Sequence, residues 1–221
     1  MNKTLLSLTV LATMLTATIG CTSLQPRQPG SQSGPAAKGT SLFNGKDLSG
    51  WEAHGGATWK VEKGALVGTQ GPGNAPGDLL TKASYRDFDL TVTYKIDWPA
   101  NSGVWFRYQS PQKTYQADIL EYKKPVAYSG TIYCPGKLFI AIHDNKELVD
   151  RDGWNTLRIR AQGDHLQVWL NGHLVGDVHD QTSDCGKIGF QIHPGDQFAK
   201  MKITVREVIL QPICNAQGAA G

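Results

Sequence analysis

Three stretches of the sequence place aromatic, amide and ionisable side chains at alternating positions: NSGVWFRY (101–108), YQADILEY (115–122) and GKIGFQIHPG (186–195). Alternate side chains share a face of an extended chain. Each stretch therefore presents one pair: Trp105 with Arg107, Gln116 with Asp118, and Gln191 with His193. Aromatic rings pack on the C–H face of a pyranose, and amides and carboxylates bind its hydroxyl groups. Each residue alone is commonly solvated or hydrogen-bonded in a core, but the three pairs together predict a carbohydrate cleft.

The elements that would carry these residues are β-strands. Apolar side chains recur with a period of two in residues 88–98, 157–161, 166–170, 188–192 and 200–210. Turn residues separate the segments, and Asn171-Gly172 is the strongest two-residue hairpin signal among them. No long segment has a 3.6-residue period. Many short, mostly antiparallel strands indicate an all-β sandwich, jelly roll or barrel, and we predict a jelly-roll β-sandwich of two antiparallel sheets.

The charge distribution argues against nucleic acid as a partner. The 221-residue chain has 22 Lys+Arg and 19 Asp+Glu, a formal charge of +3. Three of the basic residues, Lys3, Arg27 and Lys38, lie in the first 39 residues, which contain no Asp or Glu, so residues 40–221 carry 19 basic and 19 acidic residues. Nucleic-acid binding needs clustered excess positive charge. After the first 21 residues, no stretch approaches the run of about 18 apolar residues that spans a membrane.

The N-terminal residues predict export and a lipid anchor. Residues 1–21 read as a signal peptide whose Gly20-Cys21 end resembles a bacterial lipobox, with Cys21 as the lipidated residue. An ordinary secretory signal is the alternative. Thr22 and Ser23 give no inner-membrane retention signal, which favours the outer membrane, on its periplasmic or surface side. Residues 22–39 read as a flexible Pro/Gly/Ser/Gln linker, 40–212 as the folded domain and 213–221 as a disordered tail.

The cysteines leave two possibilities open. Cys134 and Cys185 both lie inside the predicted domain, and an exported protein permits a disulfide bond between them. The alternative is separate thiols.

Several blocks resemble one bacterial family in order along the chain: SLFNGKDLSGW (41–51), NSGVWFR (101–107), YQADILEY (115–122), SGTIY (129–133), GWNTLRIRAQGDHLQVWLNG (153–172) and GKIGFQIH (186–193). This is the 3-keto-disaccharide hydrolase family, also described as 3-keto-glucoside lyases or hydratases. The resemblance covers roughly residues 41–211 and implies a concanavalin A-like fold. The chain departs from the family on one strand. Gln116, Asp118 and Glu121 stand where the family commonly has Glu, Gln and Asp.

The residues 116–121 also resemble the Glu-x-Asp-x-x-Glu strand of retaining β-glucanases with the same fold. A one-residue bulge near Ile119 would bring Gln116, Asp118 and Glu121 onto one face. The first position is an amide, which is a far weaker nucleophile than a carboxylate. Glucanase chemistry is therefore not expected.

The family resemblance implies cleavage of 3-keto-glycosides by base-catalysed elimination and hydration. His193 is the expected base, because an imidazole titrates near neutral pH. Arg107 is expected to stabilise the enolate, and Asp118 or Glu121 to orient the histidine or act as acid. Further expected substrate-binding residues are Trp105, Gln116, Tyr115, Tyr133 and Gln191. Strict alternation, however, places Tyr115 opposite Gln116.

No cofactor is firmly predicted. A divalent cation held by Asp118, Glu121 and His193 is an open possibility without a tight ligand spacing. The rival to catalysis is a non-catalytic, lipid-anchored carbohydrate-binding module that uses the same cleft, and a purely structural jelly roll is a third reading. A His193 within hydrogen-bonding reach of a carboxylate favours the enzyme. A His193 buried in the core favours the binding module.

Overall fold

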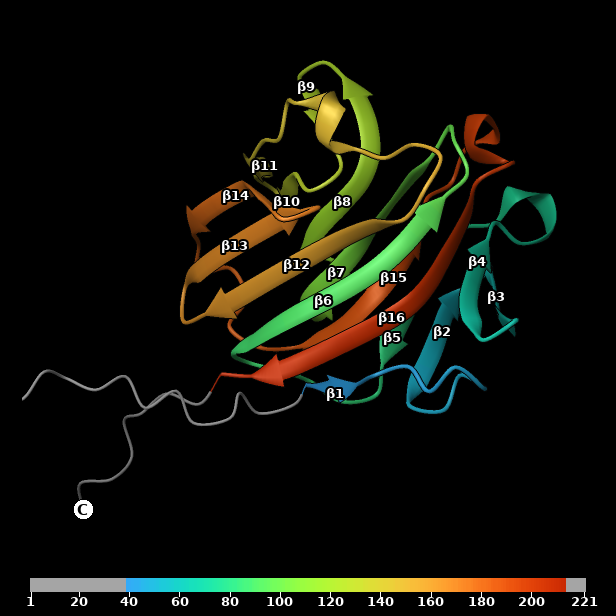
Figure 1. Cartoon of the computed structure of the whole chain (residues 1–221), viewed down its shortest axis with the longest axis horizontal. Helices are drawn as coiled ribbons and strands as arrows, with labels where there is room; N and C mark the ends of the chain where they lie inside the picture. Colours follow the sequence, from blue (N-terminus) through green and yellow to red (C-terminus); the bar gives the residue numbers. More distant parts are fainter. Residues whose placement is uncertain (1–38, 214–221) are drawn as a thin grey trace, which may run out of the picture. The chain divides into compact units, whose positions relative to one another are not determined.

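The computed structural model of the chain describes residues 39–213 (Figure 1). The predicted leader (1–21) with Cys21, nearly all of the linker (22–39) and all but the first residue of the tail (213–221) lie outside these residues. Within the described range, no helix has the length and apolar character needed to cross a bilayer.

Two antiparallel sheets of eight strands each form the domain, which confirms the predicted β-sandwich (Figure 1). In the first sheet the order is β14-β13-β12-β6-β16-β4-β3, with β1 paired to β16. Its strands are β1 (Thr40–Ser41), β3 (Thr58–Glu62), β4 (Ala65–Thr69), β6 (Phe88–Ile96), β12 (Asn155–Gln162), β13 (His165–Leu170), β14 (His173–His179) and β16 (Lys202–Pro212).

The second sheet has the order β11-β10-β8-β7-β15-β5-β2, with β9 paired to β8. Its strands are β2 (Trp51–Gly55), β5 (Gly77–Thr81), β7 (Asn101–Ser110), β8 (Lys113–Lys123), β9 (Val126–Tyr128), β10 (Ile132–Cys134), β11 (Leu138–Ala141) and β15 (Lys187–Ile192). Short 3₁₀ turns lie in the connections: η1 (Pro72–Asn74), η2 (Lys146–Leu148) and η3 (Asp196–Phe198).

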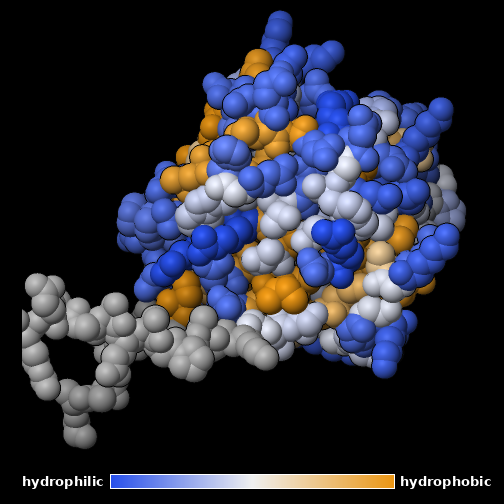
Figure 2. Space-filling model, in the orientation of Figure 1, coloured by the Kyte–Doolittle hydropathy of each residue, from blue (hydrophilic) through white to orange (hydrophobic). Residues whose placement is uncertain are grey.

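The core lies between the sheets and is built from the alternating apolar rows. On β6 the inward residues Phe88, Leu90, Val92 and Tyr94 are fully buried, and Asp89, Thr91 and Lys95 alternate with them. Figure 2 views the other face of this first sheet, where hydrophilic side chains are interspersed with less polar ones. On β15 the predicted inward row of Ile188, Phe190 and Ile192 is also fully buried. One apolar face per strand therefore specifies the sandwich.

The strongest turn signal is confirmed in the β13–β14 hairpin. Asn171 and Gly172 have φ of 49° and 86°, as a two-residue turn with two left-handed positions requires.

A β-bulge in β7 breaks the predicted alternation. Trp105 pairs with Gly189 and Tyr108 with Lys187, so Phe106 and Arg107 together face one residue of β15. Arg107, within the bulge, has a left-handed backbone conformation with a φ of 51°. A bulge reverses which side chains point outward beyond it, so Tyr108 follows Trp105 on the outer face.

Of the two possibilities left open for the cysteines, the structure has separate thiols, since Cys134 and Cys185 are both free. The Cys134 sulfur is buried on β10, 3.4 Å from the Thr182 hydroxyl. Cys185 lies beside Gln109, whose amide donates to its carbonyl at 2.8 Å. The two residues thus have separate surroundings.

Candidate functional site

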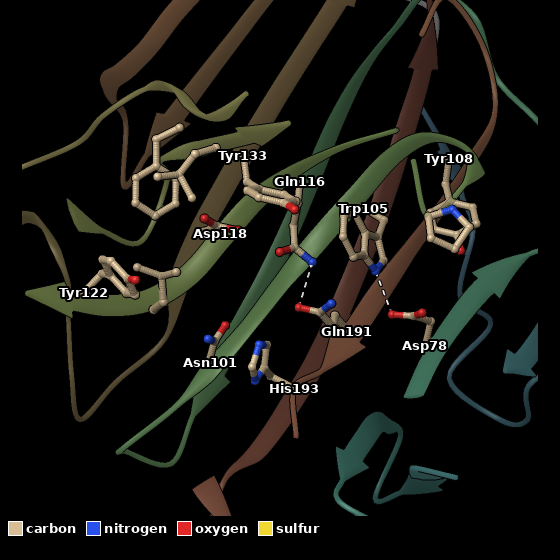
Figure 3. A pocket seen from close by; sticks show the side chains of 14 residues that line it. Asp78, Asn101, Trp105, Tyr108, Gln116, Asp118, Tyr122, Tyr133, Gln191 and His193 are labelled. Atoms are coloured by element: carbon tan, nitrogen blue, oxygen red, sulfur yellow. Dashed lines mark hydrogen bonds between the residues drawn. The ribbon is translucent and has the colours of Figure 1, made fainter. Parts of the chain in front are cut away.

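A pocket of about 390 Å³ opens on the outward face of the second sheet (Figure 3). On β8, Gln116, Asp118 and Leu120 line it, while Ala117 and Ile119 between them point into the core. Fourteen residues line the pocket: Asp78, Asn101, Trp105, Tyr108, Pro111, Gln116, Asp118, Leu120, Tyr122, Tyr133, Leu138, Phe139, Gln191 and His193.

The floor of the pocket has space for side chains because Gly103, at its centre, has none. Gly103 on β7 pairs with Asp118 on one side and with Gln191 on the other. A Cβ atom at this position would come within 2.5 Å of the Gln116 side chain. The Gln116 amide instead crosses the floor and donates to the Gln191 side-chain oxygen at 3.2 Å. The missing side chain of Gly103 thus makes room for the Gln116 amide.

Aromatic rings form one wall. The Trp105 ring meets Tyr108 edge to face at a centroid distance of 5.7 Å and Tyr133 at 6.5 Å. The indole nitrogen donates to the Asp78 carboxyl group at 2.7 Å, and this hydrogen bond fixes the orientation of the ring. Burial raises the pKa of Asp78. Trp105 is only 6% exposed, and it lines the pocket.

Asp118 is the most strongly perturbed acid of the site. It is 3% exposed, and burial raises its pKa well above the ordinary value of an aspartate. Burial also raises the pKa of the neighbouring Tyr133, and the Asp118 charge adds to that effect. A carboxyl group that favours its protonated form can donate a proton or a hydrogen bond.

His193 is half-buried at the end of β15 and turns into the pocket near Asn101 (Figure 3). Its Nδ1 lies 2.7 Å from the Pro194 carbonyl oxygen. A carbonyl only accepts, so Nδ1 carries the proton and Nε2 of the neutral ring has a free lone pair. The Phe198 ring packs edge-on at 5.9 Å. The backbone contact therefore orients the imidazole and leaves Nε2 without a proton. Within the described chain, no hydrogen bond joins it to Asp118 or Glu121.

Arg107 does not belong to the pocket, contrary to prediction. The bulge turns its side chain inward, where it is fully buried. Its guanidinium donates to the Arg86, Gly163 and Ser183 carbonyls at 2.8, 2.7 and 3.3 Å, and to Asp87 Oδ1 at 3.0 Å. These bonds use four of the five N–H donors to hold loops together, and the fully buried guanidinium does not line the pocket.

Glu121 and Tyr115 were also predicted to lie in the pocket, but neither lines it. The β7–β8 register is regular through Ile119, so the expected bulge is absent there and alternation places both residues opposite Asp118. Glu121 pairs with Arg151 outside this pocket. Tyr115 is buried and donates to Asp180 at 2.8 Å, and burial raises its pKa to about 12.

The possible cation site does not assemble, because Glu121 lies on the other face from Asp118. Within residues 39–213, no three histidine, cysteine or acidic side chains come close enough to hold a metal ion. The other predicted pocket residues, Trp105, Gln116, Tyr133, Gln191 and His193, all line the pocket with Asp118.

Sequence reasoning missed several lining residues. Asn101, Leu120 and Tyr122 continue the alternation of the predicted rows and could have been found by extending them. Tyr108 was hidden by the bulge. Asp78, on β5, had no signal, because its strand was not recognised as a neighbour of β15.

Comparison with known proteins agrees with this architecture. A 28% identical segment of 75 residues matches a 3-keto-disaccharide hydrolase from Bacteroides thetaiotaomicron, covering 30% of this chain and 26% of that protein. The match thus spans about a quarter of the curated relative.

Solved structures share the fold. A Parabacteroides distasonis protein assigned as a glycosyl hydrolase superimposes with a TM-score of 0.60 at 20% identity, covering 80% of this chain and 94% of that one. A carbohydrate-binding module from Bacillus subtilis gives 0.54 at 18% identity, covering 73% and 95%. A family model matches residues 38–208. The chain belongs to the 3-keto-alpha-glucoside-1,2-lyase-like domain family.

Proposed function

We propose that the pocket binds a glycoside oxidised at C3 and cleaves it by elimination followed by hydration. The observation that carries this proposal is the pairing of opposite chemistries in one pocket. His193 has a free Nε2 lone pair, and burial shifts the Asp118 carboxyl group toward its protonated form. Family membership supports the same chemistry.

The first step removes a proton. The C3 carbonyl acidifies the C–H bond at C2, and Nε2 of His193 takes that proton while the electron pair moves to the carbonyl oxygen. The Nδ1–H bond to the Pro194 carbonyl persists and stabilises the imidazolium that forms. The product is an enolate.

The second step breaks the glycosidic bond. The enolate electrons form the C1–C2 double bond, the C1–O bond breaks, and Asp118 gives its proton to the departing oxygen. Water then adds its hydroxyl to C1 and gives a proton to the Asp118 carboxylate, and His193 returns its proton to C2. The sum is hydrolysis, and no side chain forms a bond to C1.

Neutral donors must stabilise the enolate oxygen. Arg107 is committed elsewhere, and none of the fourteen described residues lining the pocket is a lysine or an arginine. The Asn101 amide and the Tyr133 hydroxyl are suitable lining donors, because preorganised hydrogen bonds stabilise charge that develops in the transition state.

Aglycone release from 3-keto-glucosides of both anomers tests the proposal. His193→Gln and Asp118→Asn should each lower turnover by about 100-fold or more, the usual effect of a placed base or acid. His173→Gln, on β14 outside the pocket, should have no effect. Hydrolysis of an ordinary β-glucan together with inertness toward the keto-glucosides would contradict the mechanism.

One observation favours sugar binding without turnover as a second function. His193 has a backbone carbonyl rather than a carboxylate as its partner, which is a weaker arrangement for activating a base. Sugar binding measured by calorimetry, with no aglycone released from any keto-glucoside, would support this binding module.

A further inference from the structure

The pocket has two halves of different chemistry. The polar half comes from β5, β7 and β15 and includes Asp78, Asn101, Gln191 and His193. The apolar half comes from the end of β8 and from the β10–β11 hairpin, and consists of Leu120, Tyr122, Leu138 and Phe139. In Figure 3, Tyr122 lies on the opposite side of the pocket from Asp78, with Asp118 between them.

The apolar half is open to solvent although its side chains are large. Tyr122 is 43% and Leu138 51% exposed. Tyr122 and Phe139 hold each other edge to face at a centroid distance of 5.7 Å. Exposed apolar side chains grouped at a pocket mouth are typical of a binding surface.

Leu138 is held in a strained conformation at this rim. Its φ is 62°, in the left-handed region that favours glycine or asparagine, and it follows the Pro135-Gly136-Lys137 turn of the β10–β11 hairpin. Strain of this kind persists where the surrounding structure fixes it and is concentrated at functional sites. The β10–β11 hairpin therefore holds Leu138 in an unfavourable backbone conformation in which its exposed side chain lines the pocket.

We propose that the apolar half is the aglycone subsite, and that it selects an aromatic or alicyclic aglycone over a second sugar. A second sugar would meet a surface whose polar group is the Tyr122 phenol, so few of its hydroxyl groups would gain a hydrogen bond to the protein. A flat hydrocarbon ring would pack on Tyr122, Leu138 and Phe139 and needs no such hydrogen bond. The part of this inference that concerns turnover rests on the proposed function.

The test compares an aryl glucoside and a glucose disaccharide of the same anomer, both oxidised at C3. Wild-type kcat/KM should favour the aryl substrate. Leu138→Asn keeps a residue suited to positive φ and should lower aryl kcat/KM by about tenfold while the disaccharide changes by less than about twofold. Leu174→Asn is the matched control, because Leu174 is also 51% exposed but lies on β14, outside the pocket.

Preference for the disaccharide, or an equal loss on both substrates in Leu138→Asn at unchanged thermal stability, would overturn the subsite and leave the lyase intact. If neither substrate is cleaved, the lyase fails, and calorimetry with the unoxidised aryl glucoside decides the subsite separately. Binding weakened by Leu138→Asn and not by Leu174→Asn supports it. Absent or unaffected binding overturns it.

Discussion

The surroundings act differently on two ionisable side chains of the pocket, by changing the pKa of Asp118 and by orienting the ring of His193. Asp118 is tuned by burial, which raises its pKa and favours the neutral acid. His193 is oriented by a hydrogen bond to Pro194, which sets the tautomer and frees Nε2. Residue types alone named His193 as a base and left Asp118 and Glu121 as alternative partners or acids, because the burial and the backbone contacts that distinguish them are not visible in a motif.

The raised pKa of Asp118 predicts how stability varies with pH. A buried carboxyl group of this kind stabilises the fold while protonated, and the contribution is lost as pH rises from the ordinary carboxyl range through the folded pKa. Asp118→Asn cannot ionise. Its unfolding free energy relative to wild type should therefore increase with pH from about pH 4 upward, by up to about 1.4 kcal/mol per unit. Urea unfolding at several pH values measures this, and parallel curves would contradict the assignment.

Arg107 should act on stability and not on sugar binding. Arg107→Met removes the donors to the Arg86, Gly163 and Ser183 carbonyls and to the Asp87 carboxylate. Losing one member of a buried ionic pair costs about 3–5 kcal/mol. Urea unfolding should show that loss, while calorimetry below the thermal transition should find sugar affinity unchanged. A stable variant with weakened binding would return Arg107 to the site.

At the scale of elements, the strands carry the site, and their register decides which residues enter it. Alternation predicted the outward positions of Trp105, Gln116, Asp118, Gln191 and His193 correctly, because β8, β15 and the part of β7 before the bulge are regular along these stretches. It failed for Arg107, because a bulge adds a residue to β7. Bulges depend on neighbouring strands that the local sequence does not specify, so this error follows from missing tertiary information.

Gly103 should matter for the pocket more than for the fold. In Gly103→Ala the new Cβ would displace the flexible end of Gln116 and break its bond to Gln191. Sugar affinity should fall by roughly five- to tenfold, the effect of one lost hydrogen bond, with little change in thermal midpoint. The double variant with Gln116→Ala should lose little more than Gln116→Ala alone. Fully additive losses would mean that Gly103 acts by another route.

For the whole molecule, the sequence predicted the two-sheet sandwich because each strand alternates one apolar row with one polar row. The sequence did not predict which strands belong to which sheet, because strands such as β5 and β15 pair across more than a hundred residues of sequence. That pairing brings Asp78 beside Trp105. The choice between a Cys134–Cys185 disulfide bond and separate thiols stayed open for the same reason: membership of one domain does not place two thiols side by side, and both are free.

The separation between core and pocket predicts opposite effects for two nearby residues of the β15 segment. Phe190 is fully buried and stacks on Trp51 at 5.8 Å, so Phe190→Ala leaves a cavity between the sheets and should cost about 3–5 kcal/mol. His193 lies on the outer face, half-buried, and His193→Ala should cost much less. Urea unfolding of both variants gives the comparison. A larger loss for His193→Ala would mean that the histidine supports the sandwich, and its assignment as the base of an open pocket would then fail.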